Sequence, residues 1–236
     1  MASNGSFLAH FFFGALHAIV LSAMYSKSQE SLESQLIFYA TYHQHPVNVA
    51  IHVVFIPLIW WTLIIMASHF PFMGMSIQVP GTSHDITWGT TGFLGYALYY
   101  VWLDPLMGSL CSLILLAMYL VAANLAAKAR SEVSPEKRRK AGLEVWQWAL
   151  ILQVLSWYMQ IHPGHMVYEG VKPALVDSLG DALTAAPFFS FYDVVWTLFP
   201  GAAASSLKAR VAMGVAERRL AMCAANPALR FCSQLS

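Results

Sequence analysis

Residues 39–57 read YATYHQHPVNVAIHVVFIP, and this stretch decides the fold because it carries three histidines and an asparagine into an apolar segment. The 51 residues from Ser34 to His84 contain no Asp, Glu, Lys or Arg, so this part of the chain suits a low-dielectric setting. A buried imidazole without a partner costs roughly 1–3 kcal/mol there. The histidines therefore need a metal ion, a hydrogen-bond network or a bound polar head group.

The composition of the whole chain is that of a membrane protein. It has 236 residues, of which 58% are hydrophobic and 11% are charged, whereas globular domains have roughly a quarter of charged residues. Apolar segments lie at residues 7–24, 49–68, 92–103, 105–127, 145–161 and 188–199. Because lipid offers the backbone no hydrogen-bond partner, helices are the expected solution. We predict an all-α polytopic membrane bundle with about four to six apolar helices.

Several function classes are excluded or disfavoured. A net charge of +1 gives no concentrated basic face, so we expect no nucleic-acid partner. The three cysteines are odd in number, and we therefore expect no disulfide framework. The chain also contains no G-x-S-x-G, phosphate-loop, H-E-x-x-H or dinucleotide-binding motif.

A second polar cluster, HPGHMVYEG, occupies residues 162–170 after the apolar segment at 145–161. Pro163 suits the first turn of a new helix, in which His165 and Glu169 would share a face. Asn48 and His52 in the first stretch are also four residues apart and share a face in the same way. Counting membrane crossings places both clusters on one side, where their imidazoles would suit iron, zinc or copper.

A purely structural interpretation of the histidines remains open at this point. Histidines near a membrane interface often cap helices or hydrogen-bond across them. We favour that interpretation for the isolated histidines, namely His10, His17, His69 and His84. For His43, His52 and His165, the pairing of two clusters favours a functional role.

The two clusters resemble those of a known family, the 2-hydroxy fatty acid dioxygenases of fatty acid α-oxidation. The resemblance rests on SQLIFYATYHQHPVNVAIHVVFIP at 34–57 and SWYMQIHPGHMVYEGVKPAL at 156–175, and it covers roughly residues 30–200. It implies a multi-pass enzyme of the endoplasmic reticulum that uses iron(II) and O2. Its substrate would be a 2-hydroxy fatty acid, which is returned one carbon shorter in the breakdown of phytosphingosine.

The resemblance also implies roles for particular residues. His43 and His52 match the histidines of the first motif, while His165 and Glu169 match the second. We predict a metal site formed by His43, His52, His162 and His165. Glu169 would orient an imidazole by accepting a hydrogen bond from the free N–H of that ring. We predict that Asn48 and Glu169 are catalytic residues. Iron(II) with open positions would chelate the carboxylate and the 2-hydroxyl of the substrate, so plain acids should be poor substrates.

The sequence suggests three segments. Residues 1–30 form an N-terminal extension with its own apolar segment, residues 31–200 form the membrane-embedded dioxygenase-like domain, and residues 201–236 form a surface helix and tail.

Two other function classes remain as alternatives. The first is a membrane diiron lipid hydroxylase or desaturase, although such enzymes generally need more paired histidines than this chain supplies. The second is a non-enzymatic lipid-binding or scaffold protein in which the histidines only bridge helices.

The sidedness of the site depends on the segment at 92–103. Six of the thirteen basic residues lie between Lys128 and Lys140, which the positive-inside rule places in the cytoplasm. If residues 92–103 cross the membrane, both histidine clusters face the lumen. Twelve residues span only about 18 Å of a ~30 Å hydrocarbon core, so we favour a re-entrant segment and a cytosolic site.

Overall fold

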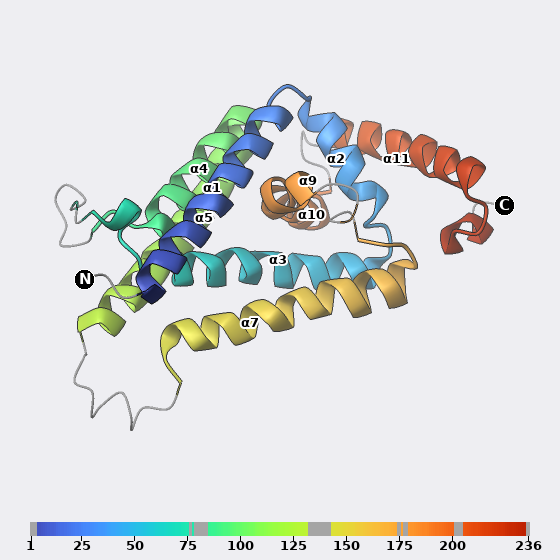
Figure 1. The fold of residues 1–236 in the computed structure, drawn as a ribbon. Helices are drawn as coiled ribbons and strands as arrows, with labels where there is room; N and C mark the ends of the chain where they lie inside the picture. The colour runs from blue at the N-terminus through green and yellow to red at the C-terminus, as the bar shows by residue number, and fades with distance from the viewer. Residues whose placement is uncertain are drawn as a thin grey trace. The chain divides into compact units, whose positions relative to one another are not determined.

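The computed structural model describes residues 4–75, 77, 85–131, 143–173, 176, 179–200 and 205–234. His84 and most of the basic segment at 128–140 lie outside this part of the chain. The described residues form helices and contain no strand, which confirms the predicted all-α fold (Figure 1).

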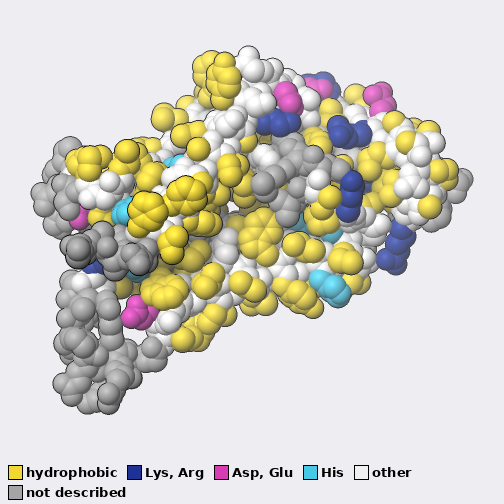
Figure 2. All heavy atoms as spheres, viewed as in Figure 1, with side chains coloured by type: hydrophobic (Ala, Val, Ile, Leu, Met, Phe, Trp, Pro, Cys, Tyr) yellow, Lys and Arg dark blue, Asp and Glu magenta, His cyan; other side chains and the backbone are white. Residues whose placement is uncertain are grey.

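Within the part of the chain that the structure describes, three helices are long and apolar enough to cross a membrane. They are α1 (Asn4–Lys27), α3 (Pro46–Ala67) and α5 (Pro105–Ser131). The other apolar helices are shorter: α4 (Trp88–Leu103), α7 (Val145–Met159) and α10 (Ala186–Leu198). The predicted apolar segments thus coincide with helices, and apolar side chains cover much of the surface seen in Figure 2.

The chain divides into two compact units, and three helices contribute to both. The first unit contains residues 1–22 and 58–155, and the second contains residues 23–57 and 156–236.

The first unit is held together by helix α5 and its neighbours. Asp104 caps α5 by accepting hydrogen bonds from the amides of Leu106 and Met107, both at 3.0 Å. Pro105 is the first residue of α5, a position for which the fixed φ of proline is preorganised. Helix α4 packs on α5 through a 2.8 Å hydrogen bond between Thr90 Oγ1 and the Tyr119 hydroxyl.

The second unit contains the two histidine motifs. It includes α2 (Leu32–Thr41), the first half of α3, and the π-helix η2 (Gln160–Glu169), which continues α7 without a break. Among the described residues, it also includes α9 (Leu179–Thr184), α10, α11 (Ser205–Ala225) and η3 (Arg230–Gln234). Lys and Arg side chains gather over α2 and α11 in Figure 2.

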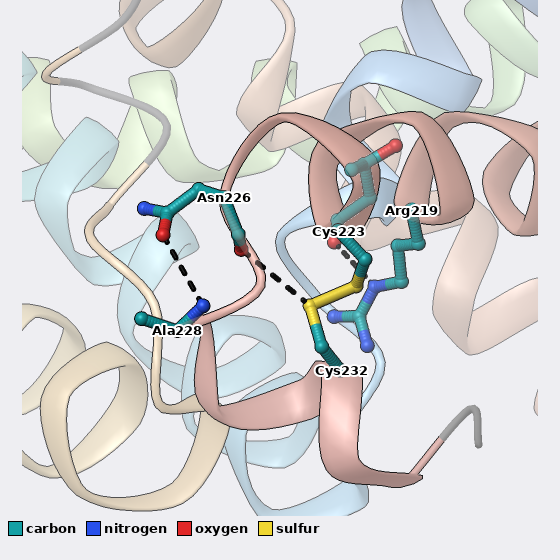
Figure 3. The surroundings of a disulfide bond; sticks show 6 residues. Arg219, Cys223, Asn226, Ala228 and Cys232 are labelled. Carbon is teal, nitrogen blue, oxygen red and sulfur yellow. Dashed lines mark hydrogen bonds between the residues drawn. A yellow bond between two sulfur atoms is a disulfide. The ribbon is translucent and has the colours of Figure 1, made fainter.

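A disulfide joins Cys223 on α11 to Cys232 on η3 (Figure 3). The structure thus contains one disulfide, where the sequence predicted no disulfide framework. An odd number of cysteines still allows one pair when the third, Cys111, is buried in an apolar helix.

Candidate metal centre

His43 lies in the turn between α2 and α3. Its Nδ1 is 2.7 Å from the carbonyl oxygen of Tyr39, and its ring stacks on the Tyr39 ring with 4.0 Å between centroids. Tyr39 in turn packs against Phe189 on α10. These contacts fix both the position and the orientation of the His43 imidazole.

His52 follows on the second turn of α3. Its Nδ1 is 2.9 Å from the carbonyl oxygen of Asn48, four residues earlier. A ring nitrogen facing a carbonyl oxygen must carry the proton, so the other ring nitrogen keeps its lone pair. In both His43 and His52, the Nε2 atom is therefore the one available as a metal ligand.

His165 reaches the same place from the π-helix η2. Its ring centroid lies 4.9 Å from that of His43 and 4.8 Å from that of His52. A π-helix has i→i+5 hydrogen bonds and is often found at functional sites. The wider turn here contains Pro163, which has no N–H to donate.

The three histidines form one buried cluster. Their candidate ligand nitrogens all lie within 4.8 Å of one another, and the residues are only 2–7% exposed. Among the described residues, Nε2 of His43 and Nδ1 of His165 have no hydrogen-bond partner. Buried nitrogens without partners are costly unless something binds them, so this donor set fits a metal ion.

Burial also keeps the imidazoles neutral. It lowers the pKa of His43 well below its ordinary value, and the neighbouring rings of His52 and His165 lower it further. Burial likewise lowers the pKa of His165 to about 4. At neutral pH both rings are deprotonated and keep a lone pair for a ligand bond.

Glu169 ends the π-helix and binds the turn that carries His43. Its carboxylate accepts hydrogen bonds from the backbone amides of Gln44, at 3.0 and 3.1 Å, and His45, at 2.8 Å. It also accepts one from Nδ2 of Asn48 at 3.1 Å and forms a buried ion pair with Arg219. Both oxygens are thus hydrogen-bonded, and Glu169 lies outside the group of three histidines.

Two small features allow the motifs to meet. A Cβ atom at Gly164 would lie 2.6 Å from Oδ1 of Asn48 and 3.3 Å from Cε1 of His52, so only glycine permits this approach. Gly170 ends the π-helix with a φ of 72°, the left-handed conformation that glycine adopts without strain. Its amide bonds the carbonyl oxygen of His165 at 2.8 Å.

Three details of the predicted site differ in the structure. His162 is exposed and stacks on Tyr158 with 5.5 Å between centroids, outside the cluster. Pro163 lies inside a continuous helix rather than starting a new one. Glu169 makes its hydrogen bonds to backbone amides, Asn48 and Arg219, and among the described residues it bonds no imidazole.

Arg219 and Tyr39 contact site residues and were not predicted. Tyr39 belongs to the quoted stretch, four residues before His43, which is the spacing of a local contact on a helix. Arg219 lies on a separate helix that reads as a charged surface segment, and nothing in its local sequence points to the site.

Comparisons with known proteins identify the family to which the chain belongs. A sequence model of the family described as "2-hydroxy-palmitic acid dioxygenase Mpo1-like" matches residues 29–197. The 2-hydroxy-palmitic acid dioxygenase MPO1 of Saccharomyces cerevisiae is 29% identical over 167 residues, which cover 71% of this chain and 81% of the yeast protein. No solved structure matches the chain. The matched region contains all three clustered histidines and well over half of the sequence, and the chain belongs to the Mpo1-like family.

Proposed function

We propose that this protein is an iron(II)-dependent dioxygenase that converts a 2-hydroxy fatty acid to the acid one carbon shorter. One observation carries the proposal: three buried histidines with available ring nitrogens converge inside the region that matches the family. His43, His52 and His165 would hold the iron. When bound, iron(II) with open positions supplies a place for O2 and for the carboxylate and 2-hydroxyl of the substrate.

The residues around the histidines prepare the site for this reaction. Burial keeps His43 and His165 neutral and excludes water from the cluster. Glu169 fixes the His43 turn through the amides of Gln44 and His45. The acyl chain would lie along apolar helices. Since each buried methylene contributes only ~0.8 kcal/mol, chain length should be discriminated weakly.

The overall chemistry needs no separate reductant. A 2-hydroxy acid and O2 balance against the shortened acid, carbon dioxide and water, because the oxidation of the C1–C2 unit supplies all four electrons that O2 accepts. This separates the proposal from a diiron hydroxylase or desaturase, which needs a reductant and leaves the chain length unchanged.

We further propose the endoplasmic reticulum membrane as the location and sphingoid-base breakdown as the source of the substrate.

Two observations point in opposite directions on which side of the membrane the site faces. Helix α4 has 16 residues, about 24 Å against a ~30 Å core, which favours a re-entrant segment and a cytosolic site. The Cys223–Cys232 disulfide favours the oxidising lumen. Labelling of single cysteines at positions 44 and 134 in sealed microsomes decides between them.

The proposed reaction is tested with purified, iron-loaded protein in detergent. We expect O2-dependent conversion of 2-hydroxypalmitic acid to the fifteen-carbon acid without added reductant, and little conversion of palmitic acid. Chelation of the iron should abolish turnover. Equal turnover of the two acids, or a product of unchanged length, would contradict the proposal.

A further inference from the structure

Arg219 lies on helix α11 and is buried although it is charged, with 9% of the residue exposed. Its Nε donates a 2.9 Å hydrogen bond to the carbonyl oxygen of Thr41, and its Nη2 forms the ion pair with Glu169. The guanidinium carbon lies 4.4 Å from the centroid of the Phe231 ring. One planar group thus contacts three separate segments of the second unit.

Two of these segments adjoin His43 and His165 of the cluster. Thr41 ends α2, two residues before His43, and Glu169 ends η2, four residues after His165. Glu169 also holds the amides of Gln44 and His45, which follow His43 directly. Arg219 therefore joins the segment that carries His43 to the segment that carries His165.

We propose that Arg219 is a positioning residue of the metal centre, acting through Glu169 and Thr41. This inference rests on the proposed function and deepens it. Helix α11 lies beyond residues 29–197, which the family match covers, so it extends the site past the matched region.

Charge and geometry both call for arginine at this position. A buried carboxylate needs a cationic partner, and Arg219 is the one that Glu169 has among the described residues. The rigid fork of the guanidinium serves Glu169 and Thr41 at the same time, which the single ammonium of lysine does not reproduce.

The C-terminal segment holds Arg219 in place. Arg219 and Cys223 lie four residues apart on the same face of α11, and Figure 3 shows the arginine side chain beside the disulfide. The disulfide fastens η3, and therefore Phe231, to α11. Phe231 also packs in a cluster with Tyr42 and Val171, next to the site.

The test measures Co²⁺ binding to metal-free protein in detergent, because the visible spectrum of Co²⁺ reports its ligands without any turnover. In R219Q we expect affinity to fall about 10- to 100-fold, the usual effect of losing a group that supports metal ligands, together with a changed spectrum. R219K should recover part of the loss. R218Q is the matched control, since Arg218 is exposed and contacts the Phe38 ring, and it should bind like the wild type.

A double variant tests the route through Glu169. If Arg219 acts through that carboxylate, E169Q/R219Q should bind Co²⁺ no more weakly than E169Q alone. If R219Q fails to fold, the same Co²⁺ measurements are made on R219K and on E169Q/R219Q, in which both charges of the buried pair are removed.

Wild-type affinity and spectrum in R219Q, or in R219K if R219Q fails to fold, would overturn the inference, as would fully additive losses in the double variant. Neither result would touch the proposed function. That proposal fails instead if the wild type gives no Co²⁺ spectrum with imidazole ligands.

Discussion

The histidines of the two units share a local contact but differ in what surrounds them. In four of them, Nδ1 contacts the carbonyl oxygen four residues earlier at 2.7–2.9 Å, namely His17 and His69 in the first unit and His43 and His52 in the second. The other ring nitrogen of His17, Nε2, is hydrogen-bonded to Oγ1 of Thr91 at 3.1 Å. The Nε2 atoms of His43 and His52 instead face the cluster with His165.

The comparison shows that a contact between Nδ1 and a preceding carbonyl oxygen does not by itself create a metal site. A histidine whose Nδ1 faces the carbonyl oxygen four residues earlier is held in one tautomer in either unit. His69 even has a buried Nε2 without a hydrogen-bond partner, as His43 does. Among the described residues, only His43, His52 and His165 bring their nitrogens together. Convergence of several histidines, rather than burial of one, therefore marks the candidate metal centre.

Removing one histidine from each unit gives the largest expected difference. His52→Ala should lose bound iron, with a fall in affinity greater than the about 10- to 100-fold that follows loss of a supporting residue. His69→Ala removes the same local contact, together with a buried Nε2 that has no hydrogen-bond partner among the described residues, but should keep its iron. Metal analysis of the purified variants measures both, and equal iron in the two would remove the basis of the comparison.

Reduction of the disulfide should affect only the second unit. Cys223 and Cys232 are nine residues apart, and opening so short a loop costs about 2–3 kcal/mol. Hydrogen exchange of the Cys223→Ser variant should therefore rise in α11 and η2, while α4 and α5 keep wild-type protection. A Cys111→Ser variant is the control for loss of a thiol. Unchanged exchange in α11 would show that the disulfide does not stabilise this region.

A methyl group at Gly164 should disturb the meeting of the two motifs. Gly164→Ala places a Cβ 2.6 Å from Oδ1 of Asn48, and such overpacking typically costs about 1–3 kcal/mol. The midpoint temperature of thermal unfolding in detergent should fall, and so should the iron content. Gly95→Ala is the matched control, because the nearest atom to its Cβ is 3.7 Å away, an ordinary contact. If Gly164→Ala is as stable and as iron-rich as Gly95→Ala, the motifs do not approach as closely as described.

The smallest effect is expected at His162. His162→Ala removes an exposed ring that stacks on Tyr158, and surface changes of this kind usually stay within about 0.5 kcal/mol. Iron content and turnover should match the wild type. A loss of iron as large as that in His52→Ala would place His162 among the ligands, as the sequence originally suggested.

Much of the fold could be predicted from the sequence because apolar segment length and the Asp104-Pro105 turn are local signals. His43, His52 and His165 could be selected because they lie in two clusters that the crossing count places on one side. The position of His162 outside the histidine cluster could not be predicted from the sequence. In an α-helix, residues three apart share a face, but the π-helix has i→i+5 hydrogen bonds and a wider turn.

The supporting residues depend on tertiary structure and were harder to predict. Arg219 lies fifty residues after Glu169, and its helix carries several exposed charges, so its sequence resembles a surface segment. The role of Glu169 was also beyond the sequence, because the amides that it binds become available only where the chain leaves α2 and turns into α3.

The ligand set of bound iron is the most direct test of the central claim. X-ray absorption at the iron edge should show three imidazole ligands in the wild-type protein and three in His162→Ala. His52→Ala, loaded with excess iron to offset its weaker binding, should show fewer. A wild-type spectrum without imidazole scattering, or one that loses a ligand in His162→Ala but not in His52→Ala, would contradict the assignment of His43, His52 and His165 as the metal centre.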